Sequence, residues 1–304
     1  MSRPALAGVA LPFILVTLIW SSTWIVIRDG LAVVPPAWSV CYRFAVAALG
    51  MLVLARIRGE SLAIGGRGLA FAALLGVAQF GFNFNLLYRA EAHLTSGLCA
   101  LVYALLMIPN SLLAWIAFRE RVSGAFMAGS AVAIIGIALL FVNEYRAGGA
   151  AAPREVLIGL ALCTLAVLCA SLANVMQAAP LARALPMASM LVWAMAIGAA
   201  ADAAYAWSVS GPPVFDPRPA YWLGVLYLAI AGSVVTFPLY FALIQRIGVG
   251  PAAYTSVLIP ILAMALSTLF EGYRWTPLAM LGVLLALGGM VIAMRARFRR
   301  QAGG

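Results

Sequence analysis

Long apolar runs alternate with short polar gaps along the whole chain. The runs are continuously apolar, and a segment that crosses lipid must satisfy its own backbone hydrogen bonds, so they predict helices rather than strands. A helix needs about 20 apolar residues to cross roughly 30 Å of hydrocarbon. Ten runs have about that length: 9–27, 37–55, 68–88, 94–117, 124–142, 155–177, 187–207, 221–243, 251–270 and 277–294. The pattern therefore predicts an all-α, polytopic membrane protein with ten transmembrane helices.

The composition excludes an ordinary soluble protein. Hydrophobic residues make up 65% of the 304 residues and charged residues 9%, whereas soluble domains carry roughly 25% charge. Nine acidic and nineteen basic residues cannot cover the surface of a 32 kDa globule. No A-x-A-like cleavage site separates the first run from the second, so we expect the first run to be a retained helix.

The basic residues predict the orientation in the membrane. All nineteen are Arg. With the N-terminus inside, the cytoplasmic segments hold twelve of them and the outer segments six, and Arg43 lies within the second run. The positive-inside rule then predicts that both termini lie in the cytoplasm. The membrane that we expect is a bacterial inner membrane. We expect the basic tail at 295–300 to anchor this topology and to contact anionic lipid rather than nucleic acid.

The two halves of the chain carry matching sequence features. The segment Tyr103–Pro109 in the fourth run recurs as Tyr254–Pro260 in the ninth, 151 residues later. The fifth and tenth runs share a pattern of small residues at the same spacing: Gly129, Ala133, Gly136 and Gly282, Ala286, Gly289. These matches predict two repeats, 1–146 and 147–304. Each repeat has five helices, an odd number, so the second is inverted relative to the first, as in many secondary transporters.

Prolines and small residues suggest how the helices are shaped and packed. Pro109, Pro238 and Pro260 each remove a helical hydrogen-bond donor, so we predict helix breaks there that serve gating. A fixed kink that only improves packing is the alternative. The small residues of the fifth and tenth runs allow close helix approach, either within a monomer or across a homodimer.

The runs lack the chemistry of an enzyme. Ser residues have no His and Asp partners, carboxylates are not paired at helical spacing, and no residue set has metal-ligand spacing. We therefore expect no catalysis, no metal and no cofactor. Neutral polar and aromatic residues remain as candidate cavity-lining residues, namely Trp20, Ser21, Trp24, Gln79, Asn83, Tyr88, Tyr103, Asn174 and Tyr254.

These candidates suit a zwitterionic substrate. Hydroxyl and amide groups can bond a carboxylate and an ammonium group without carrying a net charge, and aromatic faces favour an apolar side chain or the ammonium. Interhelical packing is the alternative for each of them. Arg43 is a further candidate because a base within the membrane is expensive to bury.

Several motifs resemble a known family. The segment Ile19–Trp24, the Arg43-Phe44 pair and the Glu120-Arg121-Val122 turn are similar to the drug/metabolite transporter superfamily and its EamA branch. The polar and aromatic segment 79–88 is most similar to the YddG-type aromatic amino-acid exporters. The resemblance implies a central cavity surrounded by the first, third, fourth, sixth, eighth and ninth helices, with the fifth and tenth at the edge. It also implies that Arg43 has a structural role.

The expected function is export of amino acids, aromatic or large neutral ones, through a central cavity by alternating access. Three alternatives stay open: an exporter of other small metabolites or cationic drugs, a nucleotide-sugar or phosphate-ester exchanger, and a membrane-embedded enzyme or scaffold. No acidic residue lies in the middle of a run; Asp202 and His93 lie near run ends. We therefore expect a facilitator or exchanger rather than a proton-driven transporter.

The predicted topology can be tested by cysteine labelling. A Cys placed at Arg146 or Ser210 should react with an impermeant maleimide added from outside the cell, because both positions lie in predicted outer gaps. A Cys at Glu60 or Gln301 should react only after the membrane is permeabilised. The reverse pattern would contradict both the orientation and the inverted repeat.

Overall fold

The structure, a computed structural model, describes residues 3–119, 123–147, 152–252 and 255–301. Within these ranges every regular element is a helix, and there is no strand. The elements are α1 (Arg3–Gly30), α2 (Pro36–Ile57), α3 (Gly65–Leu75), η1 (Gly76–Asn83), α4 (Phe84–His93), α5 (Ser96–Ala104), α6 (Met107–Phe118), α7 (Gly124–Ala147), α8 (Ala152–Ala178), α9 (Pro180–Ala184), α10 (Met187–Ser210), α11 (Pro219–Ala229), η2 (Ile230–Val235), α12 (Thr236–Ile247), α13 (Val249–Ala252), α14 (Thr255–Phe270) and α15 (Pro277–Gln301).

The predicted all-helical, multi-pass membrane protein is confirmed. Eight helical stretches of the described chain are long and apolar enough to cross a membrane. Two shorter apolar helices, Leu258–Phe270 and Pro277–Ala293, lie where the ninth and tenth crossings are predicted. The number of ten crossings is therefore not confirmed. The third stretch, Gly65–His93, extends five residues beyond the predicted 68–88 at its C-terminal end, because the helix continues through charged residues at which the apolar run stops.

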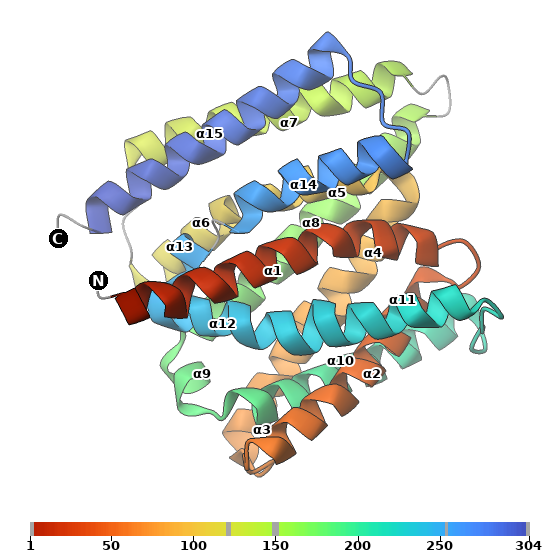
Figure 1. Cartoon of the computed structure of the whole chain (residues 1–304), viewed down its shortest axis with the longest axis vertical. Helices are drawn as coiled ribbons and strands as arrows, with labels where there is room; N and C mark the ends of the chain where they lie inside the picture. Colours follow the sequence, from red (N-terminus) through yellow and green to blue (C-terminus); the bar gives the residue numbers. More distant parts are fainter. Residues whose placement is uncertain (1–2, 120–122, 148–151, 253–254, 302–304) are drawn as a thin grey trace.

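The helices form one bundle with a separate pair along one edge (Figure 1). That pair is α7 and α15, and α1 lies in the middle of the other helices, packed against α12 and α14. Helix α2 packs against α10, and α4 packs against α8. The start of α1 and the end of α15 lie at the same end of the bundle (Figure 1).

Helices α7 and α15 pack at backbone contact distance. A Cβ added to Gly136 would lie 2.3 Å from the backbone nitrogen of Ala286, and one added to Gly289 would lie 2.3 Å from the nitrogen of Ala133. The partners run in opposite order along the two helices, so the pair is antiparallel. The small residues of the fifth and tenth runs thus face each other within one chain. Of the two alternatives that the sequence left open, a monomer contact or a homodimer contact, they form the contact within the monomer.

Three of the membrane-crossing stretches are not uniform α-helices. The third and eighth contain the π-helical segments η1 and η2, and the fourth is interrupted between α5 and α6. Pro109 lies in the first turn of α6, just after this interruption, and Pro238 lies in the first turn of α12, just after η2. Helix α14 continues through Pro260, so this proline does not end a helix. Irregular helices in a membrane need neighbours that satisfy the freed backbone groups.

An aromatic cluster surrounds the loop between α10 and α11. Tyr42 stacks on Phe215 with ring centroids 5.7 Å apart and donates a hydrogen bond to the carbonyl of Val214 at 3.0 Å.

In the same loop, hydrogen bonds from Arg218 hold the pKa of Asp216 below its usual value. This pair therefore stabilises the fold above the ordinary pKa of Asp, and the contribution is lost as the pH falls through the lowered value. The aromatic rings around this loop, such as Tyr42 and Phe215, are of the kind that is typical of membrane–water interfaces.

The tight packing of α7 on α15 predicts a position-specific effect of one methyl group. Gly289→Ala should lower the thermal unfolding temperature in detergent, because overpacking costs about 1–3 kcal/mol. Gly288→Ala is the matched control: a Cβ there meets no atom within 4 Å, and Ala is the better helix former. Equal unfolding temperatures for the two variants would contradict the close contact.

Candidate functional site

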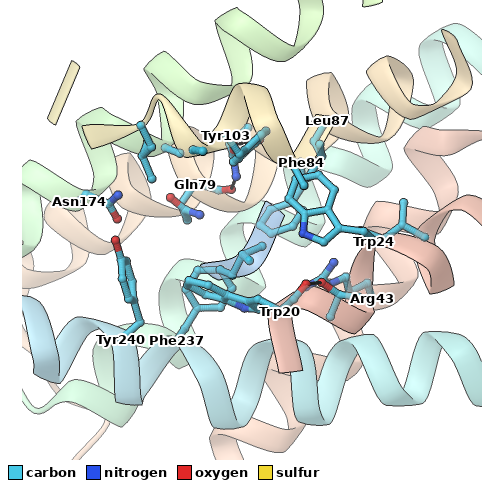
Figure 2. A pocket seen from close by; sticks show the side chains of 18 residues that line it. Trp20, Trp24, Arg43, Gln79, Phe84, Leu87, Tyr103, Asn174, Phe237 and Tyr240 are labelled. Atoms are coloured by element: carbon cyan, nitrogen blue, oxygen red, sulfur yellow. Dashed lines mark hydrogen bonds between the residues drawn. The ribbon is translucent and has the colours of Figure 1, made fainter. Parts of the chain in front are cut away.

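A cavity lies in the middle of the bundle, between helices that are far apart in the sequence (Figure 2). Its volume is about 100 Å3, which is room for several water molecules or part of a small solute. Its lining comes from α1, α2, η1, α4, α5, α8, α12 and α14, together with the link between α5 and α6. The lining residues are Trp20, Thr23, Trp24, Ile27, Arg43, Gln79, Asn83, Phe84, Leu87, Ala100, Tyr103, Ala104, Leu106, Ala170, Asn174, Phe237, Tyr240 and Ile259.

Most of the candidate residues meet at this cavity. The lining includes six of them: Trp20, Trp24, Gln79, Asn83, Tyr103 and Asn174. Ser21 is buried and donates a hydrogen bond to the carbonyl of Thr17 at 2.6 Å, one turn back in α1. Tyr88 lines a second cavity instead. Tyr254 lies outside the described residues.

Aromatic rings form two walls of the cavity. Trp20 contacts Tyr240 and Phe237 edge to face, with ring centroids 4.9 and 5.5 Å apart. Trp24 contacts Tyr103 in the same way at 5.3 Å. Such contacts fix the ring orientations and present both apolar faces and polar edges to the space between them.

Part of the polar lining is satisfied by neighbouring protein groups. The Tyr103 hydroxyl donates to Asn83 Oδ1 at 2.7 Å, and Asn83 Nδ2 donates to the carbonyl of Gln79 at 3.2 Å. This chain of bonds ties α5 to η1. The packing interpretation therefore applies to Asn83 and Tyr103, because their hydrogen-bonding groups already have partners inside the protein.

Three other polar atoms of the lining residues have no partner among the described residues. They are the indole Nε1 of Trp24, the amide Oε1 of Gln79 and the hydroxyl of Tyr240, and all three side chains are buried. In Figure 2 the Tyr240 hydroxyl is directed toward Asn174 across the cavity. Buried polar groups normally have partners, and leaving one unpaired costs about 1–3 kcal/mol. One donor, one acceptor and one hydroxyl at the same cavity therefore indicate a place for a polar ligand or ordered water.

Arg43 brings a charge to the cavity wall. Its side chain is buried, and its guanidinium stacks over the ring of Phe84 at 4.5 Å. It donates hydrogen bonds to the Ser233 hydroxyl at 3.1 Å, the Tyr88 hydroxyl at 3.2 Å and the Gly232 carbonyl at 3.2 Å. Within the described chain no carboxylate oxygen lies within 4.0 Å of its nitrogens. The charge is held by neutral groups and is not neutralised.

The π-helical segment η2 supplies the acceptor that holds Arg43. The Gly232 carbonyl also accepts hydrogen bonds from Trp20 Nε1 at 3.3 Å and from the Thr236 hydroxyl at 2.7 Å. A π-helical turn changes the regular ladder of backbone bonds, so side chains can reach this oxygen. A Cβ on Gly232 would lie 3.3 Å from Arg43 Nη2, so the absence of a side chain permits the close approach.

Two aromatic residues of α12 are missing from the predicted set. Phe237 and Tyr240 line the cavity. In the eighth run Ser233, Thr236 and Tyr240 follow one another at i, i+3 and i+7, a short polar stripe that the candidate set did not use. Phe237 and Tyr240 count as apolar in a hydropathy analysis and so resemble ordinary membrane-helix residues. The adjacent Pro238, already singled out as a helix break, was a second signal for this segment.

A second cavity lies near the C-terminal end of α1, which is the end of the bundle opposite the N-terminus. Arg28, Asp29, Tyr88 and Glu271 are among the residues that line it. Ile27 lines both cavities. Arg43 lines the central cavity and Tyr88 lines the second one. The hydrogen bond between these two side chains therefore connects the walls of the two cavities.

Known proteins resemble this chain in sequence and in fold. Protein PagO of Salmonella typhimurium is 23% identical, over 95% of this chain and 94% of its own. The probable amino-acid metabolite efflux pump of Escherichia coli K12 is 24% identical, over 92% of both chains. A solved crystal structure shares the fold with a TM-score of 0.71 at 20% identity, over 98% of this chain and 99% of that chain.

The family comparison covers most of the sequence. The sequence model of the EamA-like transporter family matches twice, at residues 8–142 and at residues 157–295. This agrees with the membrane-crossing helices and with the resemblance seen in the motifs, and it favours a transporter over an enzyme. The chain belongs to the EamA-like transporter family.

Proposed function

We propose that this transporter exports amino acids, with a preference for aromatic or large neutral ones, across a bacterial inner membrane. The observation that carries the proposal is the combination of groups at the central cavity. Arg43 offers a charge that no carboxylate of the described residues pairs with, Gln79 offers an acceptor that has no partner among them, and aromatic rings surround the space. A carboxylate, an ammonium group and an aromatic side chain are the matching partners.

Each part of an amino acid has a counterpart in this arrangement. Arg43 uses three donors on protein groups, and a guanidinium has five N–H donors, so two remain for a carboxylate. The Gln79 oxygen and the faces of Trp20 or Trp24 can take the ammonium group. Tyr240 and Phe237 form an apolar surface with one hydroxyl, which suits a large side chain.

The relatives support this substrate class. Two proteins named probable amino-acid metabolite efflux pumps, from Escherichia coli and Salmonella typhimurium, match over more than nine tenths of this chain. Export of other small metabolites or of drugs in the same family is the second candidate. A nucleotide sugar fits less well, because Arg43 is the one base among the described residues that line the cavity and a diphosphate carries more than one charge.

We further propose that the transporter has ten membrane helices arranged as two inverted repeats, 1–146 and 147–304, with both termini in the cytoplasm. Three observations support this. The family model matches once in each half, each half has a π-helical segment in its third predicted membrane helix, and the equivalent helices α7 and α15 pack antiparallel through the same small residues. Such symmetry suits a cavity that opens alternately to the two sides.

The irregular segments are the proposed moving parts. The break between α5 and α6 near Pro109, the segment η2 before Pro238, and Pro260 within α14 all lie in helices that line the cavity. A helix whose hydrogen-bond ladder is already interrupted loses fewer backbone hydrogen bonds when it bends than a regular helix does. We propose that these positions allow the cavity to change the side to which it opens.

The test of substrate class is uptake into proteoliposomes containing the purified protein. Labelled tryptophan, phenylalanine, leucine, glutamate and a cationic dye are presented with the unlabelled compound trapped inside. Exchange of the large neutral amino acids and not of the dye is the expected result. Exchange of the dye alone would replace the amino-acid proposal with the drug alternative.

Carboxylate recognition by Arg43 predicts a difference between two closely related compounds. Tryptamine has the ring and ammonium group of tryptophan but lacks the carboxylate, so it should compete about tenfold to a hundredfold less well, as expected for the loss of a charge-assisted hydrogen bond. Arg43→Gln should remove this difference. Equal competition by tryptophan and tryptamine in the wild-type protein would contradict the role of Arg43.

The Tyr240 hydroxyl, which has no partner among the described residues, predicts that removing this one oxygen atom weakens substrate binding. Tyr240→Phe should weaken competition by the transported amino acid, because the variant lacks a cavity hydroxyl that has no partner among the described residues. Tyr227→Phe is the matched control: this hydroxyl bonds Ser22 at 2.6 Å and does not line the cavity. Both variants should insert and unfold like the wild type, and equal competition by the two would show that the Tyr240 hydroxyl faces no substrate.

A further inference from the structure

A buried acidic side chain lies outside the central cavity. Glu91 is on the last turns of α4, is 0% exposed, and neither of its carboxylate oxygens has a hydrogen-bond donor among the described residues. A buried ionised carboxylate without a partner is strongly disfavoured, whereas a neutral carboxyl is far less costly. The arrangement therefore fits the protonated form of Glu91, and its ionised form needs a different environment.

The groups around Glu91 come from several packed elements. Helix α4 packs against α8, α2, α1 and α5. The charged or titratable groups that interact electrostatically with Glu91 are Arg28 of α1, Arg43 of α2, Tyr88 of α4, Cys99 and Tyr103 of α5, and Glu271 after α14. On the same helix His93 pairs with Glu155 of α8, and Arg89 bonds the Tyr205 hydroxyl. Arg28 and Arg43 are the two cations that act on Glu91.

Arg28 connects Glu91 with the second cavity. Its Nη1 donates hydrogen bonds to the backbone carbonyl of Glu91 and, at 3.3 Å, to that of Leu94. These carbonyls end helix α4, where a cation is favoured. Arg28 itself is exposed and lines the second cavity. A small movement of α1 away from α4 would open a route from this cavity to the Glu91 side chain and leave the guanidinium close to it.

Tyr88 connects the same region with the central cavity. It lies one helical turn before Glu91 on α4, and its hydroxyl accepts a hydrogen bond from Arg43. A substrate carboxylate that accepts hydrogen bonds from the two remaining N–H groups of Arg43 would bind the same guanidinium that holds Tyr88. Substrate binding and the position of α4 are therefore linked through one hydrogen bond, and Glu91 lies on the helix that this bond positions.

We infer that Glu91 is a proton-binding site that couples export to the entry of protons. A proton from the second cavity binds the ionised carboxylate when α1 and α4 separate, forming a neutral carboxyl that can be buried as seen here. The proton leaves on the opposite side of the membrane, and the substrate moves outward in exchange. The inference rests on the proposed transport function, and it replaces the expectation of an uncoupled facilitator, which assumed that no such acid was buried.

Two other titratable residues fit this role less well. Asp202 is buried, but its Oδ1 accepts a hydrogen bond from Asn85 at 2.7 Å, and it lines neither cavity. His93 pairs with Glu155 through its Nδ1 at 2.5 Å in an exposed position. Neither residue combines full burial, a free carboxyl and an arginine at the edge of a cavity.

The test compares two transport readouts in proteoliposomes, using the amino acid that the uptake panel identifies. The wild type should exchange substrate without any ion gradient. With an acidic interior it should also accumulate substrate, by about tenfold for one pH unit if one proton is exchanged. Glu91→Gln should keep the exchange and lose the accumulation. Asp202→Asn, the same chemical change at a buried acid away from both cavities, should keep both.

Three results would overturn the inference: exchange by the wild type with no response to the pH gradient, accumulation by Glu91→Gln, or equal loss of accumulation in Asp202→Asn. A readout without substrate covers the case in which no panel compound is exchanged, which would count against the proposed function alone. Infrared difference spectra of the purified protein over a pH series should show a protonated-carboxyl band that is missing in Glu91→Gln. An unchanged band in that variant would also overturn the inference.

Discussion

The buried guanidinium of Arg43 is the interaction on which the centre of the molecule depends. An arginine in the membrane interior must have partners for its N–H groups. It finds them on η2 and α4, through Gly232, Ser233 and Tyr88, and it rests on the ring of Phe84. These bonds fix α2 relative to two helices that come from opposite halves of the chain. The walls of the central cavity take their positions from the same contacts.

The two π-helical segments explain how such contacts form in a lipid environment. A regular membrane helix uses almost all its carbonyls internally. In η2 the Gly232 carbonyl instead accepts bonds from Trp20, Arg43 and Thr236. In η1 the side chains of Gln79 and Asn83 project into the cavity, and the Gln79 carbonyl holds the Asn83 amide. The irregular segments therefore supply polar groups to the cavity without any charged residue of their own.

Hydropathy and spacing predicted the helices and the small residues that join α7 to α15, because both depend on local sequence and on the lipid around it. They also predicted six lining residues, since a polar stripe on a membrane helix marks an inward face. They missed Tyr240, which counts as apolar, and the π-helical segments, which depend on neighbouring helices. Glu91 was missed because the apolar run ends at Arg89, although the helix continues to His93. Ser21 shared the stripe but bonds its own helix.

Arg43 and Glu91 have different roles in the proposed cycle: Arg43 binds the carboxylate of the substrate, and Glu91 binds the proton. The guanidinium of Arg43 lies at the wall of the central cavity, where the proposed recognition of a carboxylate takes place. A glutamate can gain or lose a proton, so the charge of the Glu91 region differs between states of the cycle. Tyr88 bonds Arg43 and lies one turn before Glu91 on α4, so one residue links the group proposed to bind the substrate with the group proposed to bind the proton. Separation of these tasks lets one helix, α4, respond to substrate on one side and to protons on the other.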